Sequence, residues 1–213
     1  MTAASCSRRA ALAGLAAVCG MAGAATAHPP GLASAAPMID PLLVNRALDA
    51  LFRHHDAIWS RDVIAIADYG LPSSTPRFFL VDILVGITTS LLVAHGSGSD
   101  PDHSGRLQSF SDAIGSAATS EGAYLTGEIY DGIHGPSRHL IGLDPTNAHA
   151  VERAIVIHSA WYANPDMLAK QGKLGRSDGC FAVGEQDIDL VLSRLGHGRL
   201  LYAGKSGSDG QSR

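Results

Sequence analysis

The chain has 213 residues, of which 46% are hydrophobic and 17% charged, and its formal net charge at pH 7 is −4 with histidine neutral. This length allows one well-buried core. The sequence has no basic stripe, so we expect no nucleic-acid partner, and no segment after the first 27 residues approaches the roughly 18 uninterrupted apolar residues of a transmembrane helix.

The N-terminal segment has the order of an export signal. Ser7-Arg8-Arg9 is followed by an apolar run over 10–25 and then by the small residues Ala25-Thr26-Ala27. This order predicts a signal peptide over residues 1–27, with an uncleaved N-terminal anchor as the minor alternative. Residues 28–38 then form a linker. We therefore expect an exported protein of the periplasm or cell envelope that is not stably inserted in the membrane after cleavage.

An amphipathic helix is predicted to follow the linker. Asp40 is suited to cap a helix N-terminus, and Pro41 fits the first helical position. Apolar residues then recur at helical spacing, which predicts a helix that ends near Trp59. These apolar residues are Val44, Ala47, Leu48, Leu51, Phe52 and Ile58.

The remainder of the chain is predicted to be mostly β-structure. Short segments rich in β-branched residues and bounded by Gly, Pro or Ser indicate strands. They are residues 63–67, 78–83, 90–94 and 154–158, with weaker candidates at 124–130 and 139–143 and a last strand at 200–203. A short helix is predicted at about 185–195. We expect one domain over 39–204, a β-sandwich or barrel with an N-terminal amphipathic helix and a short C-terminal helix, followed by a flexible tail over 205–213.

Cys180 is the only cysteine beyond the predicted signal peptide. A single thiol cannot form an internal disulfide, so in an oxidising compartment we interpret it as a reactive group. Free cysteine has a pKa of about 8.5, and it therefore needs a base to act as a nucleophile at neutral pH. His158 at the end of a predicted strand is the candidate base, although a strand-end histidine can also be purely structural.

The residues around these two side chains resemble a known family. His158-Ser159 and the later Ser177-Asp178-Gly179-Cys180-Phe181 resemble the His and Ser-x-Gly-Cys signature of the murein L,D-transpeptidase catalytic domain family. The resemblance extends upstream through Val93-Ala94-His95-Gly96-Ser97-Gly98, Thr126-Gly127-Glu128-Ile129-Tyr130 and His134-Gly135. It covers roughly residues 40–204.

The resemblance implies a cysteine acyltransferase that acts on peptidoglycan stem peptides without a cofactor. Cys180 would attack the carbonyl between the third-position diamino acid and the terminal D-Ala, and a thioester would remain after D-Ala leaves. An amine or water would then complete a cross-link or a hydrolysis. By the same resemblance, His158 is base and then acid, and the Ser159 carbonyl orients its ring. Backbone N–H groups around Ser177, Asp178 and Gly179 form the oxyanion hole.

Four further residues are candidates for substrate binding. The common family pattern has Arg two residues after the nucleophile, where this chain has Ala182, so Arg176 is the candidate for a substrate carboxylate. His95, Tyr124 and Glu128 are candidates for lining the cleft. The long segment between His158 and Cys180 is a candidate lid or acceptor wall.

One pair of histidines in the sequence does not lead to a site. His54 and His55 stand next to each other on the predicted helix, where adjacent residues do not share a face, so we predict no metal site.

Two other functional classes remain open at this stage. One is a sortase-like transpeptidase, in which Arg194 or Arg199 would follow the cysteine. The other is a non-catalytic envelope module that holds peptidoglycan and has an inert Cys180.

Overall fold

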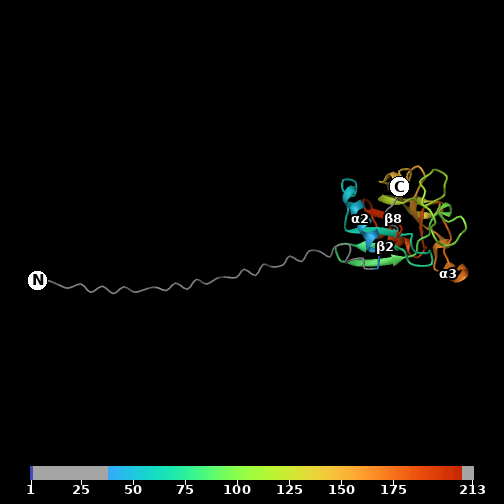
Figure 1. Cartoon of the computed structure of the whole chain (residues 1–213), viewed down its shortest axis with the longest axis horizontal. Coiled ribbons are helices and arrows are strands. Elements are labelled where there is room, and N and C mark those ends of the chain that lie inside the picture. The colour runs from blue at the N-terminus through green and yellow to red at the C-terminus, as the bar shows by residue number, and fades with distance from the viewer. Residues whose placement is uncertain (2–37, 208–213) are drawn as a thin grey trace.

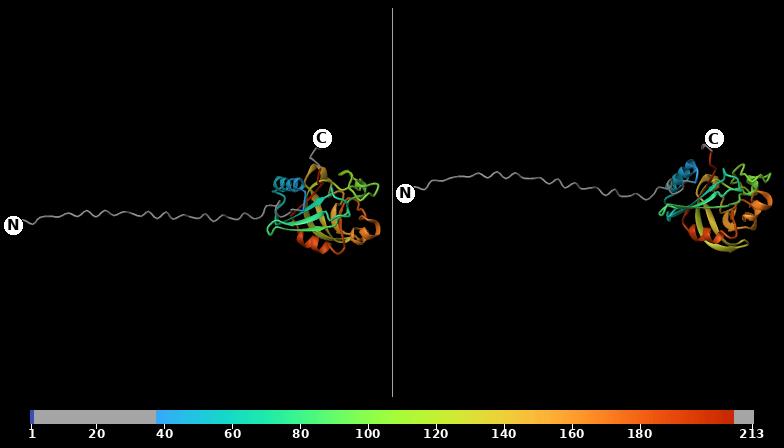
Figure 2. Two further views of the ribbon diagram at one scale, coloured as in Figure 1. Left: turned by 60° about the horizontal axis from the view of Figure 1, so that its bottom comes forward. Right: turned by 90° about the horizontal axis from the view of Figure 1, so that it is seen from below.

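The computed structural model describes Met1 and residues 38–207. The predicted signal peptide lies outside the described residues apart from Met1, and so do residues 28–37 of the predicted linker and 208–213 of the predicted tail. All described helices and strands lie between Pro41 and Gly204 and pack into one body (Figures 1 and 2).

Eight strands form a single mixed sheet in the order β3-β2-β1-β8-β4-β5-β6-β7. The strands are β1 (Val63–Asp68), β2 (Phe78–Asp82), β3 (Ile87–Leu91), β4 (Gly122–Gly132), β5 (Gly135–Gly142), β6 (Val156–Ser159), β7 (Phe181–Val183) and β8 (Leu200–Gly204). The β1–β8 and β6–β7 pairs are parallel, and the other pairs are antiparallel. Just after β3, the Ala94 N–H donates to the Ala182 carbonyl of β7 at 2.8 Å, so the sheet is nearly closed. The predicted mostly-β fold with an N-terminal helix and a short C-terminal helix is confirmed.

The N-terminal helix α2 (Pro41–Arg53) begins as predicted and ends earlier than predicted. The Asp40 carboxylate accepts hydrogen bonds from the N–H groups of Leu42 and Leu43, as an N-cap does. The helix ends at Arg53 because a turn follows, in which the Ile58 N–H donates to the His54 carbonyl. This turn brings Ile58 into the core, where its side chain is 0% exposed. Ile58 is therefore apolar because it packs in the core, although it does not belong to the helix.

The sheet has an apolar core on each face. All six residues of β1 are buried, and they alternate between the two faces. Ile64 and Ile66 pack with Leu43 of α2, whereas Ala65 and Ala67 belong to the interior core that is enclosed by the curved sheet. This double burial explains why β1 is a continuous apolar run in the sequence instead of an alternating one.

Several short elements connect the strands around the later part of the sheet. The helices are α3 (Asp166–Gln171) and α4 (Ile188–Arg194), and the 3-10 turns are Ser97–Ser99, Pro145–Asn147 and Trp161–Ala163. The strand predicted at 90–94 is displaced, since β3 ends at Leu91. Neither β7 nor α3 is predicted from the sequence.

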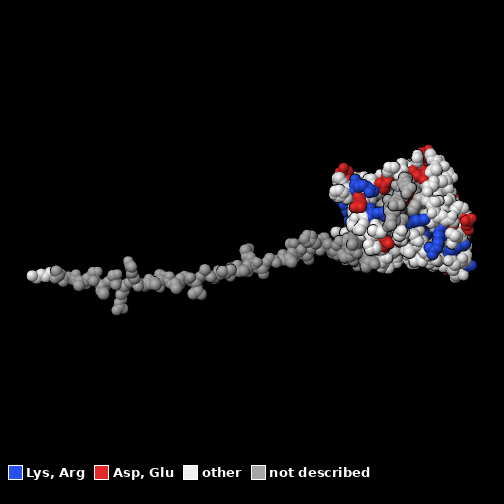
Figure 3. All heavy atoms as spheres, in the orientation of Figure 1, with Lys and Arg blue, Asp and Glu red and all other residues white. Residues whose placement is uncertain are grey.

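The charged residues on the surface are of both signs, as expected from the small net charge of the chain. On the face shown in Figure 3, lysine and arginine are interspersed with aspartate and glutamate. None of the helices in the described part of the chain has the length and apolar character needed to cross a lipid bilayer.

Candidate active site

Cys180 and His158 line the same cavity, which has a volume of about 210 Å³. The parallel pairing of β6 with β7 brings them together, because His158 is in register with Ala182, two residues after the cysteine. The other residues that line this cavity are His134, Tyr162, Arg176, Ser177 and Asp178. We call it the Cys180 cavity.

The imidazole of His158 is held in a defined orientation near the end of β6. It is 2% exposed, and its Nδ1 lies 2.9 Å from the Ser159 carbonyl oxygen. A carbonyl can only accept a hydrogen bond, so Nδ1 carries the proton and Nε2 of the neutral ring is an acceptor. Burial lowers the pKa of His158, the bond to Ser159 opposes this shift, and the neighbouring His134 adds to it. The imidazole is therefore neutral at pH 7 and able to take a proton.

The thiol of Cys180 is partly buried and makes a weak contact with the main chain. Its Sγ lies 3.6 Å from the carbonyl oxygen of Ala154. Burial raises the pKa of Cys180, and the carboxylate of Asp178 raises it further, whereas Arg153 lowers it. A neutral thiol thus lies in one cavity with a neutral imidazole. Such a pair becomes nucleophilic when the thiol proton passes to the ring.

The turn that precedes Cys180 is fixed by Ser177. Its Oγ donates to the Cys180 carbonyl at 2.7 Å and accepts from the Gly179 N–H at 3.2 Å. Its own N–H donates to the His95 carbonyl at 3.0 Å, and its carbonyl accepts from the Ser97 N–H at 2.7 Å. Within the described residues, the N–H groups of Asp178 and Cys180 are the two in this turn without a hydrogen-bond acceptor, so they are free to bind an anionic oxygen.

Replacing Gly179 with alanine is expected to damage this turn. Gly179 has a φ of +113°, and a Cβ there would lie 2.6 Å from the Ala118 carbonyl oxygen. Strain and overpacking together are expected to lower the free energy of unfolding by about 3 kcal/mol. Gly172→Ala is the control, because Gly172 also has a positive φ but open space around the Cβ position. Urea denaturation measures both, and equal losses in the two variants would contradict the close approach.

Two predicted cleft residues lie elsewhere in the structure. His95 is 1% exposed and lies behind the nucleophile turn, between Arg77 at 2.6 Å and Asp100 at 3.2 Å. Tyr124 is 0% exposed, and its hydroxyl donates to the Ser120 carbonyl at 2.9 Å. The structure brings neither side chain into the Cys180 cavity.

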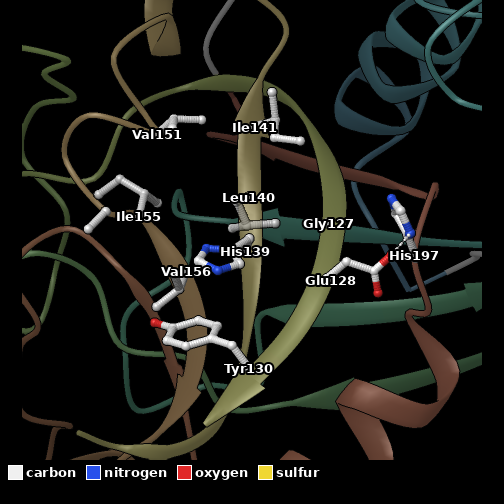
Figure 4. Close-up of a pocket in the computed structure, with 11 residues that line it drawn as sticks. Gly127, Glu128, Tyr130, His139, Leu140, Ile141, Val151, Ile155, Val156 and His197 are labelled. Atoms are coloured by element: carbon white, nitrogen blue, oxygen red, sulfur yellow. Dashed lines mark ion pairs between the residues drawn. The ribbon is translucent and has the colours of Figure 1, made fainter. Parts of the chain in front are cut away.

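The third predicted cleft residue, Glu128, lines a different and mainly apolar cavity of about 400 Å³ (Figure 4). Its carboxylate lies 2.6 Å from Nδ1 of His197 at one side of this cavity. The rings of Tyr130 and His139 stack at 4.2 Å between centroids on another side. Cys180 does not line this cavity, so Glu128 is not placed beside the thiol.

Arg176 does line the Cys180 cavity. Its Nη1 donates to the main-chain carbonyls of Asp100 and Pro101, which hold the guanidinium at the edge of the cavity. Ala182, at the position where the common family pattern has Arg, is fully buried in β7.

Two residues of the cavity were not among the sequence candidates. The ring of His134 stacks on that of His158, with centroids 4.2 Å apart and planes 20° apart. Tyr162 comes from the 3-10 turn that follows β6, and its carbonyl accepts from the Gly175 N–H. The sequence could have indicated both residues through their position in Gly-rich or irregular connections, since such connections commonly carry functional residues.

The remaining sequence alternatives find little support in the geometry. Arg194 and Arg199 pair with Asp82 and Asp62 at 2.7 Å, and neither arginine lines the Cys180 cavity. No group of three His, Cys, Asp or Glu side chains that could hold a metal ion is found among the described residues.

The segment between His158 and Cys180 folds back against the chain that follows β7. The Asn164 side chain exchanges two hydrogen bonds with Glu185, one to its carboxylate and one from its N–H.

Comparison with known proteins identifies the family. Three similar solved structures each share 13% sequence identity with this chain. An L,D-transpeptidase from Mycobacterium smegmatis has a TM-score of 0.41 and the match covers 67% of this chain and 58% of that chain, and for an L,D-transpeptidase from Mycobacterium tuberculosis the TM-score is 0.43 and the coverages are 68% and 58%. For the helical cell shape determining protein Pgp2 from Campylobacter jejuni, the TM-score is 0.42 and the coverages are 76% and 55%. This chain thus spans less than three fifths of the length of each of these chains. No curated protein is significantly similar to it. A family model described as the L,D-transpeptidase catalytic domain matches residues 35–203, which is most of the chain, and the protein therefore belongs to the L,D-transpeptidase catalytic domain family.

Proposed function

We propose that this protein is a peptidoglycan L,D-transpeptidase whose nucleophile is Cys180. The observation that carries the proposal is the shared cavity of Cys180 and His158, in which the Ser159 carbonyl fixes the imidazole tautomer. Family membership supplies the substrate class, which is the stem peptide of peptidoglycan. The reacting bond joins the third-position diamino acid to the terminal D-Ala of a stem tetrapeptide.

Acylation begins with proton transfer from Cys180 to Nε2 of His158. The sulfur attacks the carbonyl carbon, and negative charge develops on the carbonyl oxygen. The N–H groups of Asp178 and Cys180 stabilise this oxygen, because they have no other acceptor within the described residues. The carbon–nitrogen bond then breaks, and the D-Ala amine leaves with the proton from His158. A thioester to Cys180 remains.

Deacylation runs through the same two groups. An amine or a water molecule loses a proton to His158 as it attacks the thioester carbonyl, and the sulfur recovers that proton when the carbon–sulfur bond breaks. Attack by the amine of a neighbouring stem gives a cross-link, and attack by water gives a trimmed stem.

Arg176 is the proposed contact for a substrate carboxylate. It is the cationic residue that lines the Cys180 cavity, and Ala182 provides no charge at the position of the usual family arginine. A planar guanidinium can pair with a carboxylate through two parallel hydrogen bonds. Export to the cell envelope, which the N-terminal segment predicts, would bring the enzyme to this substrate.

The test is direct detection of the thioester. The folded, reduced protein is incubated with a disaccharide-tetrapeptide, and its intact mass is measured. We expect a mass increase equal to the substrate without D-Ala, located on the peptide that contains Cys180, together with free D-Ala. A folded protein that releases no D-Ala and forms no adduct would rule out the proposed reaction.

A further inference from the structure

A second cavity adjoins the nucleophile turn. It has a volume of about 390 Å³ and is lined by Ile114, Gly115, Ala117, Arg153 and Asp178. We call it the Arg153 cavity. Asp178 lines both this cavity and the Cys180 cavity. Arg153 directly precedes Ala154, whose carbonyl lies 3.6 Å from Cys180 Sγ. A molecule in the Arg153 cavity would therefore lie against the turn that carries Cys180.

Of the two charged residues that line the Arg153 cavity, Arg153 has a carboxylate partner and Asp178 has no charged partner among the described residues. Nη1 of Arg153 lies 3.3 Å from the Asp112 carboxylate, and it also donates to the Ser111 carbonyl. The side chain of Asp178 is exposed and makes no hydrogen bond or ion pair with any described residue. Because Asp112 compensates the charge of Arg153, the cavity presents one uncompensated negative charge, and that charge favours a cationic ligand.

The wall of the Arg153 cavity is fixed against the nucleophile turn. The backbone of residues 116–118 approaches three glycines so closely that none could carry a Cβ. A Cβ would lie 2.3 Å from the Ala117 carbonyl oxygen at Gly96, 1.9 Å from that of Ser116 at Gly98, and 2.6 Å from that of Ala118 at Gly179. The distance between this wall and the turn that carries Asp178 is thus set by backbone contacts, which gives a preformed site.

We propose that the Arg153 cavity is the acceptor subsite and that Asp178 determines its specificity for primary amines that are protonated in solution. The side-chain amine of the diamino acid in a second stem has this chemistry. This inference rests on the proposed function, because a thioester on Cys180 is what the acceptor attacks. Asp178 attracts the ammonium form, which releases one proton to solvent to become the free amine, and the amine gives a second proton to His158 as it attacks. The nitrogen–carbon bond then forms, the carbon–sulfur bond breaks, and the thiol recovers the proton.

The experiment measures how the thioester is partitioned between an amine and water. The protein is acylated with a disaccharide-tetrapeptide, and two acceptors are compared: diaminopimelate, whose amines are protonated at neutral pH, and hydroxylamine, which is uncharged at neutral pH. In Asp178→Asn, we expect the ratio of aminolysis to hydrolysis to fall about fivefold for diaminopimelate, which is the size of an exposed charge interaction. The ratio for hydroxylamine should not change. In the wild type, added salt should lower the diaminopimelate ratio only.

Two further variants serve as controls. Asp178→Glu keeps the charge and should retain most of the preference for diaminopimelate. Asp189→Asn removes an exposed carboxylate from α4 and should leave both ratios unchanged. An unchanged diaminopimelate ratio in Asp178→Asn would overturn the inference, and so would an equal fall for both acceptors. If the wild type forms no thioester at all, the proposed function itself fails, and this result is distinct from a thioester with unaltered partition.

Discussion

The Cys180→Ala variant is expected to form no acyl adduct and to release no D-Ala, and His158→Ala is expected to slow acylation by about a thousandfold. The first loss is complete because the acyl group is held as a thioester on the Cys180 sulfur, and alanine has no such atom. The second follows from burial, which raises the pKa of Cys180 and lowers that of His158, so the thiol depends on the imidazole for deprotonation. D-Ala release and intact mass measure both effects.

The pH dependence of the acylation rate tests the roles of Cys180 and His158 separately. In the wild type, acylation should rise with pH through the pKa of His158, which lies below the ordinary value of about 6.5, because a protonated ring cannot accept the thiol proton. In His158→Ala this limb should disappear, and the rate should keep rising with pH up to the raised pKa of Cys180, because only the thiolate then reacts. His55→Ala, which removes an exposed histidine after α2, should keep the wild-type profile.

Alkylation distinguishes the neutral pair from a preformed ion pair. If thiol and imidazole are both neutral at rest, iodoacetamide should modify Cys180 slowly below its raised pKa. Rapid modification in the wild type at about pH 5 would mean that the thiolate exists before substrate binds, and it would contradict the proton transfer proposed here.

The fold class, the start of α2 and the strands β1 and β2 could be predicted from sequence because their signals are short-range. Asp40 and Pro41 mark the start of α2, and the apolar runs mark β1 and β2. The end of α2 could not be predicted, because Ile58 continues the helical spacing although its side chain enters the core from a turn. The three-residue strand β7 is too short for a periodic signal and forms through its pairing with β6.

The candidate site shows the same division between local and long-range information. The Ser177 to Cys180 turn and His158 could be found because their residues are adjacent in sequence or end a strand. His134 reaches the ring of His158 only because the β4–β5 hairpin, with its register shift between Thr126 and Ile129, places its tip there. Tyr124 was expected in the cleft, but in the curved sheet its side chain faces Phe181 in the interior. Which side of a strand faces the core depends on this closure.

Arg77→Met is expected to lower the free energy of unfolding by about 3 to 5 kcal/mol, the typical cost of removing one partner from a buried charged network. Arg77 is 0% exposed, and its guanidinium donates to the carbonyls of Val93 and Leu71 at 2.9 Å. It also lies 4.8 Å from the centroid of the Tyr69 ring. Burial lowers the pKa of Arg77 to about 10, so the side chain stays charged at neutral pH. Methionine would leave the buried Val93 carbonyl and the half-buried Leu71 carbonyl without this donor.

The network continues from Arg77 to the nucleophile turn. Nη2 of Arg77 donates to Nδ1 of His95 at 2.6 Å, and Nε2 of His95 donates to Asp100 at 3.2 Å. Burial, assisted by Arg77, lowers the pKa of His95 to about 4, which agrees with this neutral tautomer. Burial alone would raise the pKa of Asp100, but hydrogen bonds from Ser104 and from neighbouring N–H groups hold it well below its ordinary value. The main chain of His95 in turn accepts from the Ser177 N–H.

Because these contacts connect Arg77 to Ser177, Arg77→Met should also slow thioester formation under conditions where the variant is still folded. Chemical denaturation at neutral pH measures the stability, and intact mass after incubation with the tetrapeptide measures the reaction. Arg106→Met is the matched control, since Arg106 is exposed in the connection that carries Asp100, and its change in the free energy of unfolding should be within about 0.5 kcal/mol of zero. A comparable loss in the two variants would show that the buried network does not hold the turn, and the geometry of the Ser177 to Cys180 segment would then need another source of order.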